Sequence, residues 1–476
     1  MKITAALALA IALIAVPAAA GTSSVSPRTT NNDDSCDIAV LPAATLLVPY
    51  FEVDFSAGQS GAATTLFTVQ NVSAVPQIAH VTLWTDWGYP VISFPMFLSG
   101  YDVQAINLYD VLVANRIAPP SGTSNESPLP ANNPAGARPD ANASNPNFGP
   151  TAAFDCAQGV VPQSIPSSML VDVRTLLTTG RGGNSISCPS GASQAQVGSN
   201  HGAKAIGYLT IDVVSTCWND VPTSTGYFSH VILFDNVLVG DYQQVVPRGA
   251  TSYAQGGPMV HIRAIPEGGA IGSQPATNLP YTFYDRLTKN EPSRTFDRRQ
   301  PLPSTFAARY IQGGTGGFNT QLKIWREALT SGDAACNTYV TNGNMTIAEQ
   351  FRFDEHENAV TLPSKTVLQA ASLLPTTSSV FPPVPSAAGD VAGWMYLNLN
   401  NGGSTAYSAA TGRDFRTGTT TSVGPRQSQG WVITTLFAEP TYAVEMTAPA
   451  LGNGCSPAPA TASTTRPVGP AANATP

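Results

Sequence analysis

Two short clusters in this 476-residue chain combine side chains that could bind a ligand or a metal ion. The first, Trp84-Thr-Asp-Trp-Gly-Tyr89, places three aromatic rings around Asp86. Aromatic faces stack on sugar rings and a carboxylate accepts hydrogen bonds from hydroxyl groups, so Trp84, Asp86, Trp87 and Tyr89 are candidate residues of a glycan platform. The alternative, which we favour, is that the tryptophans cap a hydrophobic core while the aspartate forms a turn.

The second cluster is the acidic run Asp354-Glu-His-Glu357. Calcium takes hard oxygen ligands, so Asp354, Glu355 and Glu357 are candidate calcium ligands, and calcium is the single cofactor that the sequence indicates. Successive side chains on a strand point to opposite faces, so these carboxylates converge only if the chain turns here. A solvated turn without a metal ion is the simpler interpretation.

Motifs of the common enzyme classes are missing from the sequence. It contains no G-x-S-x-G, S-x-x-K, H-E-x-x-H or P-loop pattern. The run Gly313-Gly-Thr-Gly-Gly317 lacks the Lys-Ser/Thr ending of a phosphate-binding loop, and a flexible strand connection explains it better. Because catalytic residues can come from distant positions, enzymatic activity stays open, and the sequence favours a protein without it.

The cysteines are widely spaced, with no C-x-x-C pair and no histidine at ligand spacing. Structural metal sites and redox motifs usually need close pairs, so we expect disulfides formed in an oxidising compartment. Cys156 and Cys188 bracket one short predicted helix and are the first expected pair. The pairing of the others stays open: Cys36, Cys217, Cys336 and Cys455.

The first twenty residues predict export of the chain. Lys2 precedes an apolar run from Ile3 to Val16, and the series Ala18-Ala-Ala20 supplies an A-x-A cleavage site. This run is shorter than the roughly 20 residues that cross a bilayer, so we expect removal and no membrane-spanning segment in the mature chain. The mature protein would be periplasmic, on the cell surface or extracellular, and the signal peptide looks bacterial.

Composition and charge limit the fold class and the partners. Charged residues make up only 11% of the chain, which holds 41 glycines and 40 prolines, and the apolar runs are rich in β-branched and aromatic residues, so we expect a mostly β protein. The net charge of −7 and the lack of a Lys/Arg cluster argue against nucleic-acid binding. At the densest basic spot, Arg298-Arg299 beside Asp297, we expect a solvated or salt-bridged turn.

Strand-like segments follow one another without helical connections, which is typical of antiparallel β-sandwiches. One short helix is expected where Met169, Leu170, Val173 and Leu177 share a face, ending before Gly180. The predicted strands are 46–53, 64–71, 78–85, 91–98, 103–108, 207–214, 230–239, 259–265, 306–311, 320–327, 348–354, 393–399, 431–437 and 442–447.

The two halves of the chain resemble each other in the order of these segments. Residues 46–51 match 306–311, residues 64–69 match 320–325, and residues 207–212 match 393–398. We therefore expect an all-β fold of tandem antiparallel β-sandwiches with long loop insertions, which resembles Ig-like or fibronectin-like modules in general architecture only. One large sandwich built from both halves is the alternative.

This interpretation divides the chain into segments and leads to a functional expectation. We expect an exported bacterial protein with a structural, adhesive or ligand-binding role; the alternative is a secreted carbohydrate-active enzyme or carbohydrate-binding protein. Its partners would be cell-envelope components, glycans or further copies of itself. The expected segments are a signal peptide (1–20), a polar leader (21–44), a first module (45–265) with a loop insertion (117–205), an irregular linker (266–305), a second module (306–455) and a disordered tail (456–476).

Overall fold

The computed structural model describes residues 38–117, 165–181, 196–215, 221–264, 282–284, 287, 297–327, 347–361, 370–375, 391–399 and 429–451, apart from short gaps within these ranges. The predicted signal peptide, most of the leader, residues 118–164 of the insertion and the tail lie outside the described residues. All six cysteines, including the expected pair Cys156 and Cys188, lie outside them as well.

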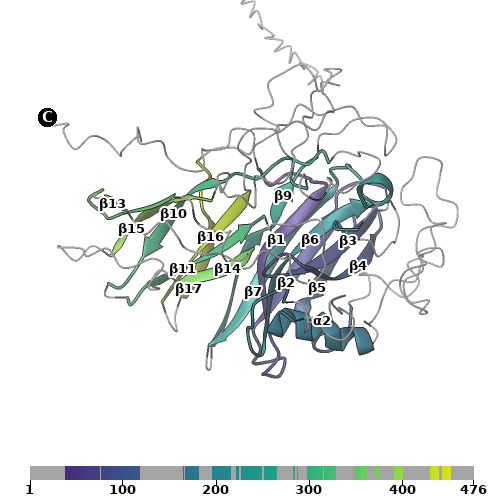
Figure 1. Ribbon diagram of the computed structural model, residues 1–476, viewed down its shortest axis with the longest axis horizontal. Helices are drawn as coiled ribbons and strands as arrows, with labels where there is room; N and C mark the ends of the chain where they lie inside the picture. The colour runs from purple at the N-terminus through teal and green to yellow at the C-terminus, as the bar shows by residue number, and fades with distance from the viewer. Residues whose placement is uncertain are drawn as a thin grey trace, which may run out of the picture.

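The described residues form antiparallel β-sheets, which confirms the predicted fold class. We call the part of the chain that carries β1 to β9 the first unit and the part that carries β10 to β17 the second unit. In Figure 1 the second unit lies to the left and the first to the right, along the long axis. The strands of the first unit are β1 (Thr45–Asp54), β2 (Thr64–Asn71), β3 (Gln77–Thr85), β4 (Pro90–Leu98), β5 (Val103–Asn107), β6 (Lys204–Val214), β7 (Leu238–Arg248), β8 (Thr251–Pro258) and β9 (Val260–Ile262).

The second unit contributes the remaining strands. They are β10 (Thr305–Ile311), β11 (Asn319–Arg326), β12 (Glu349–Phe353), β13 (Ala359–Thr361), β14 (Ala371–Pro375), β15 (Ala392–Asn398), β16 (Gly430–Ala438) and β17 (Tyr442–Thr447). The predicted helix is α2 (Ser167–Thr179), and Gly180 directly after it has φ +67°, a conformation that ends helices at low cost for glycine.

The segment 230–239, predicted as a strand, is a different structure. Tyr227–Val231 forms one π-helical turn, and the strand β7 begins only at Leu238. A short apolar run is expected to be buried whether it forms a helix or a strand, so its pattern does not distinguish the two. Four further elements were not predicted, namely α1 (Leu108–Leu112), β8, β13 and β14.

The strand order of the first unit is repeated in the second. Sheet 1 has the order β4-β3-β6-β1-β9, and sheet 3 read from its other edge has the order β13-β12-β15-β10. Sheet 2 has the order β5-β2-β7-β8, and sheet 4 has the order β14-β11-β16-β17. Each strand of the second unit therefore corresponds to the strand of the first unit numbered nine lower. Residues 449–451 bond to β10 at the place that β9 takes beside β1.

Individual residue pairs also correspond between the units. Thr45 pairs with Asp212 between β1 and β6, and Thr305 pairs with Asn398 between β10 and β15. Asp212 and Asn398 are the last residues of the two segments that we matched, 207–212 and 393–398, so the matched segments pair with their neighbours in the same register. The similarity that we read from the sequence therefore reflects equivalent positions in the two units.

In both units a glycine of the matched segment lies very close to the backbone of the neighbouring strand. A Cβ atom on Gly207 would lie 1.9 Å from the carbonyl oxygen of Trp84, and one on Gly393 would lie 2.0 Å from that of Phe353. Real Cβ atoms do not approach a carbonyl oxygen so closely, so glycine is required at both places.

The predicted match needs two shifts of one residue. β1 contains a β-bulge that β10 lacks, so Phe51 corresponds to Tyr310. Thr65, and not Thr64, corresponds to Thr320, because each of these two hydroxyl oxygens accepts a hydrogen bond from the backbone of the first strand of its own unit. A period-two pattern alone cannot fix a register to better than this.

Three large hydrophobic clusters, and a small one formed by Ala44, Phe234 and Ala264, lie among the described residues. One lies between sheets 1 and 2, and one lies between sheets 3 and 4. The third joins the units: Tyr208 of sheet 1 meets Trp325 of sheet 4 edge to face, with ring centroids 5.9 Å apart, and Phe283 stacks on Trp325 at 5.6 Å. The two units thus share an aromatic interface.

A buried polar cluster fixes the connection between the units. Asp212 Oδ2 accepts hydrogen bonds from the hydroxyls of Tyr227 at 2.6 Å and Tyr284 at 2.9 Å. Arg299 pairs with Asp297 at 2.9 Å and lies 3.8 Å from Asp212, and all three charged side chains are fully buried. Burial raises the pKa of Asp212, which the positive charge of Arg299 opposes.

This cluster corrects one expectation. We expected a solvated or a salt-bridged turn at residues 297–299. The turn is salt-bridged. It is not solvated, because Asp297, Arg298 and Arg299 are all 0% exposed. Both guanidinium groups lie over the ring of Phe234, at 5.2 and 5.3 Å from its centroid. The neighbouring sequence gives no sign of this burial, because the partners come from distant strands.

Replacing Arg299 with methionine tests the role of this cluster. The change leaves two buried carboxylates without their cation, which costs roughly 3–5 kcal/mol of unfolding free energy. Urea denaturation of Arg299→Met measures this, with Arg116→Met as control, because the side chain of Arg116 is 65% exposed. Equal losses in the two variants would contradict the assignment.

Candidate functional site

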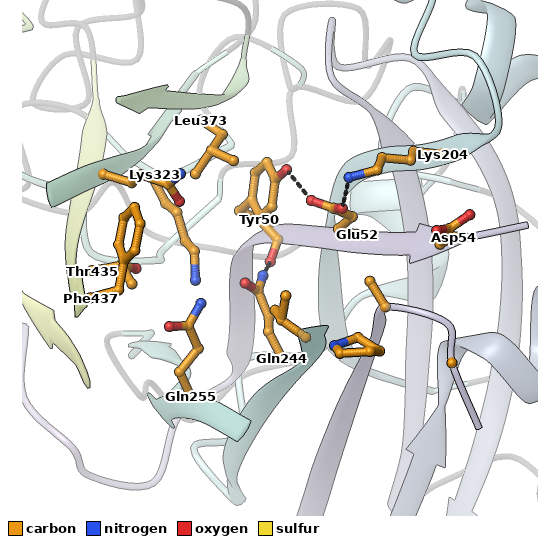
Figure 2. A pocket seen from close by; sticks show the side chains of 15 residues that line it. Tyr50, Glu52, Asp54, Lys204, Gln244, Gln255, Lys323, Leu373, Thr435 and Phe437 are labelled. Atoms are coloured by element: carbon orange, nitrogen blue, oxygen red, sulfur yellow. Dashed lines mark hydrogen bonds and ion pairs between the residues drawn. The ribbon is translucent and has the colours of Figure 1, made fainter. Parts of the chain in front are cut away.

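The interface between the units opens at one end into a polar cleft. This cleft has a volume of about 300 Å³ and is lined by residues of both units. Figure 2 shows Tyr50, Glu52 and Lys204 of the first unit along one side and Thr435 and Phe437 of the second unit along the other. Clefts between structural units are common ligand sites, because two surfaces can each supply polar groups.

The β-bulge in β1 directs side chains into this cleft. Leu46 and Val48 face the core of the first unit, and strict alternation would place Tyr50 there too. The bulge between Val48 and Phe51 shifts the alternation, so Tyr50 joins the interface while Phe51 joins the core. Pro49, which cannot donate a backbone hydrogen bond, lies within the bulge, where proline is tolerated. Tyr50, Glu52 and Asp54 thereby line the same cleft.

Hydrogen bonds hold these side chains in place. The hydroxyl of Tyr50 donates to Glu52 Oε2 at 3.0 Å, and Lys204 Nζ pairs with Glu52 Oε1 at 2.6 Å. Gln244 Nε2 donates to the backbone oxygen of Tyr50 at 2.9 Å. Burial, together with the nearby Glu52 carboxylate, raises the pKa of Tyr50 well above its usual value. The first-unit side of the cleft is therefore preorganised.

A buried ion pair forms the second-unit side. Lys323 Nζ contacts the carboxylate of Glu445, which also accepts a hydrogen bond from the hydroxyl of Tyr242, and the side chains of Lys323 and Glu445 are only 2% and 3% exposed. Burial lowers the pKa of Lys323, and the Glu445 carboxylate opposes that shift. Because Tyr242 belongs to β7 and Glu445 to β17, this contact also ties the two units together.

Two polar atoms at the cleft have no partner among the described residues. They are Thr435 Oγ1 and Gln255 Oε1, and both are buried. Thr435 is 1% exposed as a residue. A buried polar group normally has a hydrogen-bond partner, and each of these two atoms can accept a hydrogen bond from a molecule in the cleft.

The aromatic cluster that we singled out in the sequence lies elsewhere. Trp84 is 2% exposed, stacks on Tyr208 at 5.6 Å and donates its indole N–H to Thr210 Oγ1 at 2.9 Å. Trp84 therefore lies in the interface core, as in the structural interpretation that we favoured.

The neighbouring residues of that cluster are also engaged within the protein. Asp86 is 1% exposed; its Oδ1 accepts the backbone N–H of Ser199 at 2.9 Å, and its Oδ2 lies 3.1 Å from His201 Nε2. The indole N–H of Trp87 donates to Ser199 Oγ at 2.9 Å. Tyr89 is half-buried at the end of the same turn, and burial raises its pKa. The turn holds the chain that leads into β6.

The acidic cluster is the corresponding turn of the second unit. Asp354 Oδ1 accepts the backbone N–H of His356 at 2.9 Å, and Glu357 has φ +63°, so the chain does turn here. Glu355 Oε1 accepts the backbone N–H groups of Val391 at 3.0 Å and Ala392 at 2.8 Å. Asp86 and Glu355 therefore have the same structural role. Each accepts hydrogen bonds from the backbone of the segment that leads into the sixth strand of its unit, which is β6 or β15. Among the described residues no group of three or more His, Cys, Asp or Glu side chains could hold a metal ion.

The cleft residues were not identified from the sequence. Two signals point to them: Pro49 inside a strand pattern marks a bulge, and Lys323 interrupts the apolar run of β11 between Leu322 and Ile324. The partners of Lys323 are far away in sequence, with Glu445 122 residues further on. Sequence spacing does not bring such residues together.

Removing one member of the buried ion pair should destabilise the protein strongly. Lys323→Met leaves Glu445 buried without its cation, at a cost of roughly 3–5 kcal/mol, and adding Glu445→Gln should recover a large part of this loss. Urea denaturation of both single variants and the double variant gives the coupling energy. A double variant as unstable as the sum of the singles would contradict the pairing.

Four buried tyrosines predict a loss of stability at alkaline pH. The pKa values of Tyr50, Tyr227, Tyr242 and Tyr284 are raised well above 10.0, first by burial and then by neighbouring carboxylates. The unfolded chain then releases protons above pH 10 that the folded chain keeps, so each tyrosine stabilises the fold below pH 10 and loses about 1.4 kcal/mol of that contribution per pH unit above it.

Burial lowers the pKa of Lys323, so this residue, taken by itself, makes the free energy of unfolding rise with pH, and it opposes the four tyrosines. One group does not offset four. Denaturant midpoints measured from pH 8 to pH 11 should therefore fall above pH 10, and Tyr227→Phe should reduce the slope. A midpoint that rises or stays constant over this range would refute the assignment.

The comparisons with known proteins leave the function to be argued from the site itself. No protein-family model, curated protein or solved structure matches the chain. None of the described helices is long and apolar enough to cross a membrane.

Proposed function

We propose that this chain is an exported binding protein that holds a small, uncharged, hydroxyl-rich molecule, such as a sugar unit, in the cleft between its two units. The unpartnered hydroxyl of Thr435 carries this proposal, together with the unpartnered oxygen of Gln255 beside it. Two hydroxyl groups of a ligand can each donate to one of these oxygens, whereas an apolar ligand would leave both unsatisfied.

The charges of the lining favour a neutral ligand. The cations Lys204 and Lys323 are matched by Glu52 and Asp54 within the lining, and each lysine is already paired with a carboxylate. An anion such as a phosphate would have to displace one of these pairs. A neutral hydroxyl or amide group can instead hydrogen-bond to the unpartnered oxygens of Thr435 and Gln255 without breaking an ion pair.

The shape and the apolar part of the lining agree with a sugar-sized ligand. A volume of about 300 Å³ is at the small end for ligand sites. Phe437 and Leu373 supply apolar surface beside the polar groups. The hydrogen-bonding edges and apolar faces of a pyranose ring match such a mixed lining. Export is part of the proposal and is supported by the signal-peptide pattern of residues 1–20.

The test uses two adjacent threonines. Thr435 lines the cleft and Thr434 does not, although both are buried and have an unpartnered Oγ1 among the described residues. After a glycan array has identified a ligand, Thr435→Val should weaken its binding about 3- to 10-fold in calorimetry, the value of one neutral hydrogen bond. Thr434→Val should leave affinity unchanged.

Two results would overturn the proposal. One is an array, read together with calorimetry against free mono- and disaccharides, on which the folded wild-type protein binds nothing. The other is a ligand whose affinity falls equally in Thr434→Val and Thr435→Val, because binding would then not depend on the cleft.

A further inference from the structure

The outer face of sheet 3, at the far end of the second unit, is built of aromatic side chains. Phe306 and Ala308 of β10 face the core between sheets 3 and 4, as do Met395 and Leu397 of β15. Because side chains alternate along a strand, Trp394 and Tyr396 lie on the opposite face. We call this opposite side of sheet 3 the outer aromatic face.

The aromatic side chains of this face form two cross-strand pairs. Phe353 stacks on Trp394 with ring centroids 4.1 Å apart and planes 10° from parallel, and Phe351 contacts Tyr396 at 6.0 Å. Phe351, Trp394 and Tyr396 are half-buried. Phe353, which Trp394 covers, is 9% exposed. Aromatic side chains that stay partly exposed on a sheet are enriched at interaction sites.

The first unit shows what covers a face of this type. Trp84 and Tyr208 are the counterparts of Phe353 and Trp394, and they stack in the same way, 5.6 Å apart and 4° from parallel. There the face is buried by another β-sheet, because Tyr208 packs against Trp325 of sheet 4. The counterpart face of the second unit has no such sheet among the described residues of the chain.

We propose that a second copy of this chain covers the outer aromatic face of sheet 3 with its own outer aromatic face, forming a two-fold symmetric dimer. The other terminal sheet, sheet 2, is a poor match, because its exposed positions include Gln70, Asp241 and Gln243. An aromatic face is best covered by an aromatic face, and two-fold contacts between identical surfaces are the commonest form of association.

The charges around the face fit this arrangement. Arg309 is exposed on β10, on one side of β15, and the carboxylates of Asp354 and Glu357 follow β12 on the other side. A two-fold axis along β15 places β10 of one copy over β12 of the other. Arg309 then lies over the acidic turn of the second copy, so opposite charges flank the aromatic centre on both sides.

Size-exclusion chromatography with light scattering tests the proposal on the full mature chain. The wild type should have twice the mass of one chain and should dissociate on dilution. Tyr396→Glu should be monomeric, because it places a charge in the centre of the face, while its melting temperature stays within a few degrees of the wild type at monomer concentrations. Tyr101→Glu is the matched control and should remain dimeric, since Tyr101 is 68% exposed in the first unit.

A second variant tests the orientation. Arg309→Glu should weaken the dimer about tenfold at low salt and less at high salt, because the contact that it reverses is solvent-exposed. A wild type that is monomeric at every concentration, or a dimer that Tyr396→Glu leaves intact, overturns the proposal. Open-ended polymers overturn the two-fold arrangement, and an Arg309→Glu dimer of unchanged affinity overturns the placement of the axis.

Discussion

The buried carboxylate of Asp212 is the constraint on which the arrangement of the two units depends. It lies on the central strand β6 and binds Thr45 of β1, Tyr227 of the π-helical turn and Tyr284 of the connecting segment. Arg299, which begins the path into the second unit, is held by Asp297 and by Asp212. A buried charge is tolerated only with such partners, so these contacts hold Tyr284 and Arg299 of the connecting segment against the first unit.

The second unit packs against the first through the aromatic cluster that Tyr227 and Tyr284 share with Trp325. Sheet 4 meets sheet 1 through Trp325 and its aromatic neighbours, and the interface is apolar there. Along β11 the same face continues with Lys323 and Gln321, and along β1 it continues with Glu52 and Asp54. The interface therefore changes from apolar to polar along its length. A cleft is the physical result, because charged side chains at this end keep the two sheets from closing on each other.

The sequence was sufficient for those features that depend on local pattern. Alternating residues predicted most strands of both units, and the short helix ended at Gly180 as its spacing indicated. The match between residues 207–212 and 393–398 was found because glycine and the alternation around it are required twice for the same steric reason. Segments with weak patterns, such as the glycine-containing β8, were missed.

The site depended on features that local patterns do not contain. Thr435 looks like any threonine in a strand, and only its position beside the first unit makes its hydroxyl significant. The two clusters that looked chemical, around Asp86 and Glu355, turned out to be equivalent turns that bind backbone N–H groups. Acidic residues are conspicuous in a sequence with few charges, but a carboxylate is equally suited to organising a turn.

The β-bulge at Pro49 makes the two halves of the molecule unequal. The second unit repeats the strand order, but β10 pairs with β15 without interruption and has no extra residue. The side chains of β10 keep strict alternation, so no residue of β10 corresponds to Tyr50. The inserted residue thus belongs to β1 alone of these two strands, and the proposed ligand, bound in the cleft that Tyr50 lines, would have a stoichiometry of one per polypeptide despite the internal repeat.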